Sequence, residues 1–128
     1  MRALSLLSLV FLLALAGCGT RDVGPTVIEG ALDGNWVTPN GDVGAGKSLV
    51  LTSSQGQVAG TGQDFDVQHQ IIGNYTIIGT YDSAGINLSM AYDDGSSATF
   101  RGQFVGTDTV KGTWTGRNGG QVTLVRVS

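Results

Sequence analysis

The side chains that could carry acid–base chemistry lie in one short stretch. His69 is the only histidine of the chain, and Asp64 and Asp66 precede it on either side of Phe65. A histidine beside a carboxylate could act as a general base, because imidazole exchanges its proton near neutral pH. Both neighbours of His69 are glutamines, however, and the two aspartates fall in an extended or turn segment. We interpret the stretch as a solvated loop, name no catalytic residue and predict that the chain is not an enzyme.

Metal and cofactor sites are not expected either. The run Asp93-Asp94-Gly95 has too few ligands at the spacing that a calcium loop requires. The single cysteine, Cys18, has no second thiol to pair with inside the chain, which excludes an intramolecular disulfide. We therefore predict no metal site, no cofactor and a fold stabilised by its own core.

Residues 41–48 read GDVGAGKS and match the phosphate-binding loop pattern letter for letter. That loop binds phosphate only when a helix follows it, because the amide groups of the helix N-terminus contact the phosphates. Here Leu49-Val50-Leu51-Thr52 follows, which is typical of a strand. We predict no nucleotide binding, a glycine-rich loop over 41–48, and little loss of stability on replacement of Lys47.

The start of the chain has the features of an export signal. Arg2 is followed by an apolar run from Leu6 to Ala16, interrupted only by Ser8, and then by Gly17 and Cys18. The run is too short to span a bilayer stably and is typical of a signal peptide. We predict that residues 1–17 are a cleaved signal peptide and that residues 18–33 form a flexible linker.

The four residues Leu15-Ala16-Gly17-Cys18 resemble the lipobox of bacterial lipoproteins. The resemblance implies cleavage before Cys18, a diacylglycerol thioether on Cys18 and acylation of the new amino terminus. It also implies a lipid-anchored envelope protein, in the outer membrane where the host has one and otherwise on the outer face of the cell membrane. The alternative is a chance cysteine near an ordinary cleavage site.

The charge of the exported part excludes some partners. The chain has seven basic and ten acidic side chains, and cleavage of the signal removes one of the basic ones, Arg2. A mildly acidic surface without a basic cluster attracts neither nucleic acid nor anionic lipid.

Residues 34–128 alternate apolar and polar side chains between short turns, the pattern of half-buried antiparallel strands. The predicted strands cover 34–38, 47–53, 57–62, 71–81, 86–92, 98–104, 110–115 and 122–126. Closure removes the exposed edges of such a meander. We therefore predict an all-β domain, an eight-stranded antiparallel up-and-down barrel.

The barrel resembles the calycin group through Gly34-Asn35-Trp36 in its first strand and Arg126 in its last. In that group, an arginine of the final strand lies over a tryptophan of the first. Residues 79–84, 97–106 and 112–114 are similar, more closely, to avidin-type barrels. The resemblance therefore implies that Trp36 and Arg126 stack where the first and last strands pair.

The same resemblance marks possible ligand-lining residues, Tyr92, Ser96, Phe100 and Trp114. Gly62, Ala98 and Phe100 stand where avidin-type proteins place a tyrosine, a threonine and a tryptophan, so polar partners for biotin are missing. We expect no tight biotin binding. Two functions stay open: a non-catalytic binding or envelope-structural module with a filled interior, and a lipocalin-like or avidin-like carrier of a small apolar or amphipathic ligand.

Overall fold

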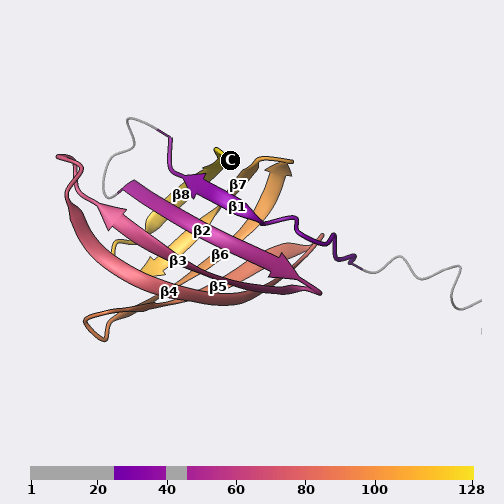
Figure 1. Ribbon diagram of the computed structural model, residues 1–128, viewed down its shortest axis with the longest axis horizontal. Coiled ribbons are helices and arrows are strands. Elements are labelled where there is room, and N and C mark those ends of the chain that lie inside the picture. The colour runs from indigo at the N-terminus through magenta and orange to yellow at the C-terminus, as the bar shows by residue number, and fades with distance from the viewer. Residues whose placement is uncertain (1–24, 40–45) are drawn as a thin grey trace, which may run out of the picture.

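The structure is a computed structural model that describes residues 25–39 and 46–128. The described residues form one closed antiparallel barrel in which every strand pairs with its neighbours in chain order (Figure 1). The strands are β1 (Gly34–Val37), β2 (Gly46–Ser54), β3 (Gln57–Phe65), β4 (Ile71–Asp82), β5 (Gly85–Tyr92), β6 (Ser97–Gly106), β7 (Thr109–Gly116) and β8 (Gly120–Arg126). The predicted eight-stranded up-and-down barrel is confirmed.

The first and last strands close the barrel by pairing at its seam. Trp36 of β1 lies opposite Arg126 of β8, and Val37 lies opposite Val125. The Arg126 guanidinium lies 4.5 Å from the centre of the Trp36 ring, a cation–π contact. The predicted pairing of Trp36 with Arg126 is confirmed.

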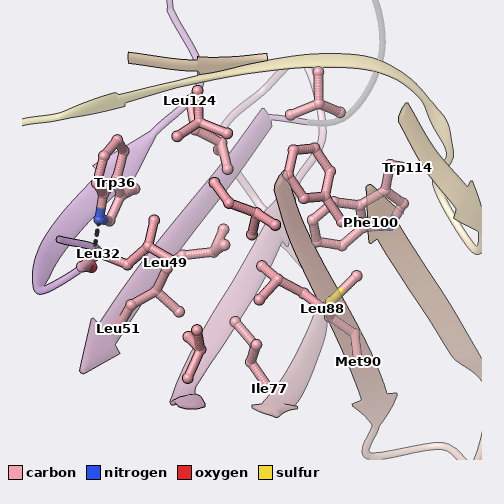
Figure 2. Close-up of a cluster of buried hydrophobic side chains, with 14 of the residues drawn as sticks. Leu32, Trp36, Leu49, Leu51, Ile77, Leu88, Met90, Phe100, Trp114 and Leu124 are labelled. Carbon is pink, nitrogen blue, oxygen red and sulfur yellow. Dashed lines mark hydrogen bonds between the residues drawn. The ribbon is translucent and has the colours of Figure 1, made fainter. Parts of the chain in front are cut away.

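The interior is filled by side chains from every second residue of the strands, which point inward. Figure 2 shows Leu49, Leu88 and Met90 in the interior between Trp36 on one side and Trp114 on the other. Their alternation with exposed Thr, Ser and Asn side chains is why the sequence forms half-buried strands. The core therefore continues from one end of the barrel to the other.

Glycines inside the strands allow the tight coiling of this small barrel. A Cβ on Gly79 would lie 2.1 Å from the carbonyl oxygen of Asn87, and a Cβ on Gly112 would lie 2.1 Å from that of Arg101. Only glycine permits such close approach of neighbouring strands, which supports the sharp curvature that closure requires.

Residues 25–33, which we call the strap, lie across one end of the barrel. Leu32 is buried in the core, and its carbonyl oxygen accepts a hydrogen bond of 2.9 Å from the Trp36 indole nitrogen, the dashed line in Figure 2. Asp33 accepts hydrogen bonds from the backbone and hydroxyl of Ser53, and the Tyr81 hydroxyl donates to Ile28 O. This last part of the expected linker is thus in contact with the barrel, because Leu32 completes the core at that end.

The two ends of the barrel carry different segments, and we call them the strap end and the plug end. The strap end holds the strap and the β4–β5 and β6–β7 turns. The plug end holds the β3–β4, β5–β6 and β7–β8 connections. Within 25–39 and 46–128, no helix is long and apolar enough to cross a membrane.

Candidate functional site

A buried ion pair lies inside the plug end. Lys47 enters from the start of β2 and Asp64 from the end of β3, and the two residues face each other across the β2–β3 ladder. The Lys47 Nζ atom lies 3.1 Å from Asp64 Oδ1, and their side chains are only 1% and 0% exposed. A charge buried this deeply needs partners, because the barrel interior replaces little of the hydration that it loses.

The partners come from three other residues, on β4, on β5 and in the β7–β8 turn. Asp64 accepts hydrogen bonds from the hydroxyl groups of Tyr75, at 3.1 Å, and Tyr92, at 2.5 Å. The Asn118 side-chain amide donates to Asp64 Oδ2 at 2.7 Å, and Asn118 O accepts from Lys47 Nζ at 3.2 Å. With the lysine, Asp64 thus accepts four hydrogen bonds. We call Lys47, Asp64, Tyr75, Tyr92 and Asn118 the polar plug.

An aromatic ring also contacts the lysine. Lys47 Nζ lies 3.8 Å from the centre of the Trp114 ring, and the Tyr75 ring packs edge-on against the same indole. Burial lowers the pKa of Lys47, and the nearby Asp64 carboxylate partly opposes that shift. Burial, reinforced by the same carboxylate, raises the pKa values of Tyr75 and Tyr92. The phenols therefore remain protonated and serve as hydrogen-bond donors.

Gly62 makes room for this arrangement. A Cβ at position 62 would lie 2.3 Å from the Tyr75 ring, so the ring occupies the space that a side chain on β3 would fill. Tyr75 itself lies opposite Gly62 in the β3–β4 ladder. The volume at this end of the interior is thus occupied by a tyrosine of the neighbouring strand.

The outer rim of the plug end is held by Arg117. Its guanidinium pairs with Asp94, donates to Ser96 Oγ and to Ile72 O, and lies 4.7 Å from the centre of the Tyr92 ring. Hydrogen bonds from Ser96, together with the cation of Arg117, lower the pKa of Asp94. The rim therefore ties the start of β4 to the β5–β6 and β7–β8 turns.

The expectation that Asp64 lies in a solvated loop is wrong, because Asp64 lies in β3 and is fully buried. Lys47, where the predicted glycine-rich loop and the predicted strand 47–53 overlap, lies in β2 and is also buried. Its burial in the ion pair argues against the small loss of stability expected on its replacement. The sequence contains a signal for the burial of both residues. Side chains two residues apart in a strand lie on the same face, so Lys47 shares a face with Leu49 and Leu51, and Asp64 shares a face with Val58. In a strand, the face that a charged residue shares with its neighbours therefore indicates its burial better than its charge does.

The other acid–base candidates lie apart from the plug. His69 is exposed in the β3–β4 connection with a positive φ of 63°, and its backbone N–H donates to Asp66 O. The Asp66 carboxylate accepts from the backbone of Gln68 and Gln70, a turn-capping role. Among the described residues, no group of three His, Cys, Asp or Glu side chains could hold a metal ion.

The four possible ligand-lining residues are distributed between core and rim. Phe100 and Trp114 are buried with their ring centres 6.1 Å apart, and Tyr92 belongs to the polar plug. Ser96 lies on the rim and bonds to Asp94 and Arg117. Their positions leave Tyr92, Phe100 and Trp114 packed against protein side chains.

The phosphate-loop pattern is only partly visible. Residues 41–45 lie outside the described residues, as do the predicted signal peptide, Cys18 and the first part of the predicted linker. Lys47 and Ser48 belong to β2, so the expectation that a strand rather than a helix follows the pattern is confirmed.

A second site is an open pocket of about 510 Å³ at the strap end. The strap contributes Thr26, Ile28 and Ala31 to its walls. The end of β4 and the β4–β5 turn contribute Tyr81, Asp82 and Ser83. The end of β6 and the β6–β7 turn contribute Phe104, Gly106 and Thr107, and β8 contributes Arg126. This pocket lies outside the filled interior.

Comparison with protein-family models and with curated proteins finds no match to this chain.

Proposed function

We propose that this chain is a lipid-anchored bacterial envelope protein whose barrel is a non-catalytic binding or structural module that acts through its outside. The observation that carries the proposal is the filled interior. An apolar core and the polar plug occupy it, and among the described residues no buried side-chain N or O atom lacks a hydrogen-bond partner. A barrel without interior space or spare polar groups is suited to present its surface.

The anchoring part of the proposal rests on Leu15-Ala16-Gly17-Cys18 and the apolar run before it. Lipid on Cys18 would hold the domain at the membrane, and two or more acyl chains make such attachment stable. The stacked Trp36 and Arg126 support the calycin-type classification of the barrel. No partnership with nucleic acid or nucleotide is proposed, because the chain is acidic and β2 follows the phosphate-loop pattern.

The non-catalytic part rests on how the titratable groups are used. Asp64 is saturated by four donors inside the barrel, whereas His69 is exposed in a turn. A general base and its orienting carboxylate must lie within hydrogen-bond reach of each other and of a substrate. Asp64 is therefore committed to the plug, and His69 lies away from it.

A carrier of a small apolar or amphipathic ligand is the second candidate function. The observation that favours it is the open pocket at the strap end. A ligand inside the barrel would have to displace buried side chains such as Phe100 or Trp114, with a loss of packing of several kcal/mol.

Anchoring is tested by replacing the acylated residue. We expect the wild-type chain to fractionate with membranes and to carry a lipid-modified amino terminus by mass spectrometry, whereas Cys18→Ser is released or stays unprocessed. Thr20→Ser, a matched change two residues later, should behave as wild type. Membrane attachment of processed Cys18→Ser without its lipid would contradict the proposal.

The filled interior is tested with the two tryptophans, whose indole N–H groups give one NMR signal for each end of the barrel. A ligand entering the interior from the plug end must move the Trp114 signal, because that ring contacts Lys47 and Tyr75. We expect apolar ligands to leave the Trp114 signal in place. A saturable shift of that signal would favour an interior carrier.

A further inference from the structure

We propose that the strap-end pocket binds the alkyl chain of a single-chain amphiphile and selects the chain rather than its head group. The ligand site is the pocket bounded by the strap and the β4–β5 and β6–β7 turns, not the barrel interior. A volume of about 510 Å³ falls in the range of small-molecule sites, about 300–1,000 Å³.

The polar groups around this pocket are already engaged within the protein. Arg126 donates to the backbone oxygens of Ala31, Asp33 and Thr107 and pairs with Asp108. The hydroxyl group of Tyr81 donates to Ile28 O, and the Ser83 hydroxyl accepts from Thr26 N. The Asp82 carboxylate accepts from the backbone of the β4–β5 turn. Since few polar groups remain to bind a head group, affinity must come from apolar contact.

The apolar side chains on the pocket wall offer that contact. Ile28 is 68% exposed although it lines the pocket, and Phe104, which also lines it, is half-buried. A chain lying between them would remove the exposed part of Ile28 from water. Such burial contributes about 25 cal/mol for each Å² of apolar surface.

The position of the pocket also points to a lipid-derived ligand, an argument that rests on the proposed anchoring. Thr26 lines the pocket, and only seven chain steps separate Cys18 from Pro25. At full extension that segment spans about 24 Å. A lipid on Cys18 would thus keep the pocket close to the bilayer, where single-chain amphiphiles concentrate.

The proposal is tested with the full mature chain made as Cys18→Ser without signal peptide, so that no lipid of its own competes. Decanoate and 1-decanol share a chain and differ in the head group, and calorimetry measures the binding of each. We expect saturable binding of both with affinities within about threefold of each other. Binding should shift the indole signal of Trp36, which stacks on Arg126, and not that of Trp114.

Three variants locate the site. Ile28→Asp should weaken binding of both probes about tenfold, because it removes the exposed apolar wall and adds a charge. Ile78→Asp is the matched control, since Ile78 is 67% exposed on the outer wall of β4, and it should bind as wild type. Gly106→Phe should block binding, because a side chain at position 106 meets no protein atom within 4 Å and would fill the pocket.

The outcomes separate this proposal from the anchoring proposal. Three results would overturn the strap-end site. They are the absence of saturable binding, an equal loss of affinity in Ile28→Asp and Ile78→Asp, and a shift of the Trp114 indole signal. Binding of decanoate alone would overturn chain selection. Each of these results leaves the membrane fractionation of wild-type chain and Cys18→Ser unaffected. Release of the wild-type chain from membranes, conversely, would contradict anchoring and leave the measured affinities standing.

Discussion

Replacing Asp64 by leucine should test the polar plug more severely than any other change. The substitution keeps the branched shape of the side chain, although leucine is larger, and it removes the acceptor of four hydrogen bonds and leaves the Lys47 ammonium buried without its counter-charge. Removal of one partner of a buried ion pair costs about 3–5 kcal/mol. A domain of this size has a free energy of unfolding of about 5–15 kcal/mol. We therefore expect Asp64→Leu to lose a fifth or more of the stability, with a fall in Tm on the order of 20 °C.

The double variant Lys47→Met/Asp64→Leu should recover at least half of that loss. Apolar residues of similar volume can replace a buried pair with little net cost, because two desolvated charges disappear together. The hydroxyl groups of Tyr75 and Tyr92 would still lack their acceptor, so recovery should be incomplete. This variant also keeps the test informative should Asp64→Leu alone fail to fold.

The assay is urea unfolding of the purified domain, followed by tryptophan fluorescence, for Asp64→Leu, for Lys47→Met and for the double variant. Asp93→Leu is the control, because Asp93 is exposed at the same end of the barrel, and it should change stability by no more than about 0.5 kcal/mol. A cost below about 1 kcal/mol for Asp64→Leu, or a double variant as unstable as the sum of the single ones, would refute the reasoning.

Three further predictions use the same unfolding assay. Stability should fall as the pH rises above about 10, because the raised pKa of Tyr75 keeps its phenol protonated in the folded chain while the unfolded chain ionises. Lys47, with its lowered pKa, contributes in the opposite sense at lower pH, and its contribution is complete near its ordinary pKa of 10.5. Tyr75→Phe should therefore reduce the alkaline loss of stability, and an unchanged pH profile would contradict the assignment. Arg126→Leu should cost about 2–4 kcal/mol through the lost Trp36 stacking and the lost hydrogen bonds to the strap, and a cost below about 1 kcal/mol would show that the seam does not need it. Gly62→Ala should cost about 1–3 kcal/mol by crowding the Tyr75 ring, whereas Gly106→Ala should be neutral, and equal effects of the two would argue against the tight fit.

The strands were predictable because each one carries its own signal. Alternation such as Ile86, Leu88 and Met90 between polar residues marks a half-buried strand wherever it occurs, and Asp93-Asp94-Gly95 marks the turn after it. Closure followed from the number of strands and their exposed edges, and the resemblance to the calycin group implied the pairing of Arg126 with Trp36.

The strand ends were predicted less well, and the candidate site lies there. β3 was predicted to end near Gly62, but it continues to Phe65 and carries Asp64 into the interior. The apolar signal fades where an inward position holds a glycine or an aspartate, so local pattern alone favours a loop.

The sequence by itself determined the strand pattern, the closed barrel, and the segment that resembles a lipobox. Only the tertiary structure decided that Lys47, Asp64, Tyr75, Tyr92 and Asn118 meet, and that the strap leaves a pocket beside Arg126. Alternation is a property of neighbouring residues, whereas Asp64 and Asn118 are 54 residues apart and meet because closure of the barrel brings the end of β3 and the β7–β8 turn to the same end. Whether a charged side chain is solvated or buried depends on the partners that such closure brings within hydrogen-bond distance.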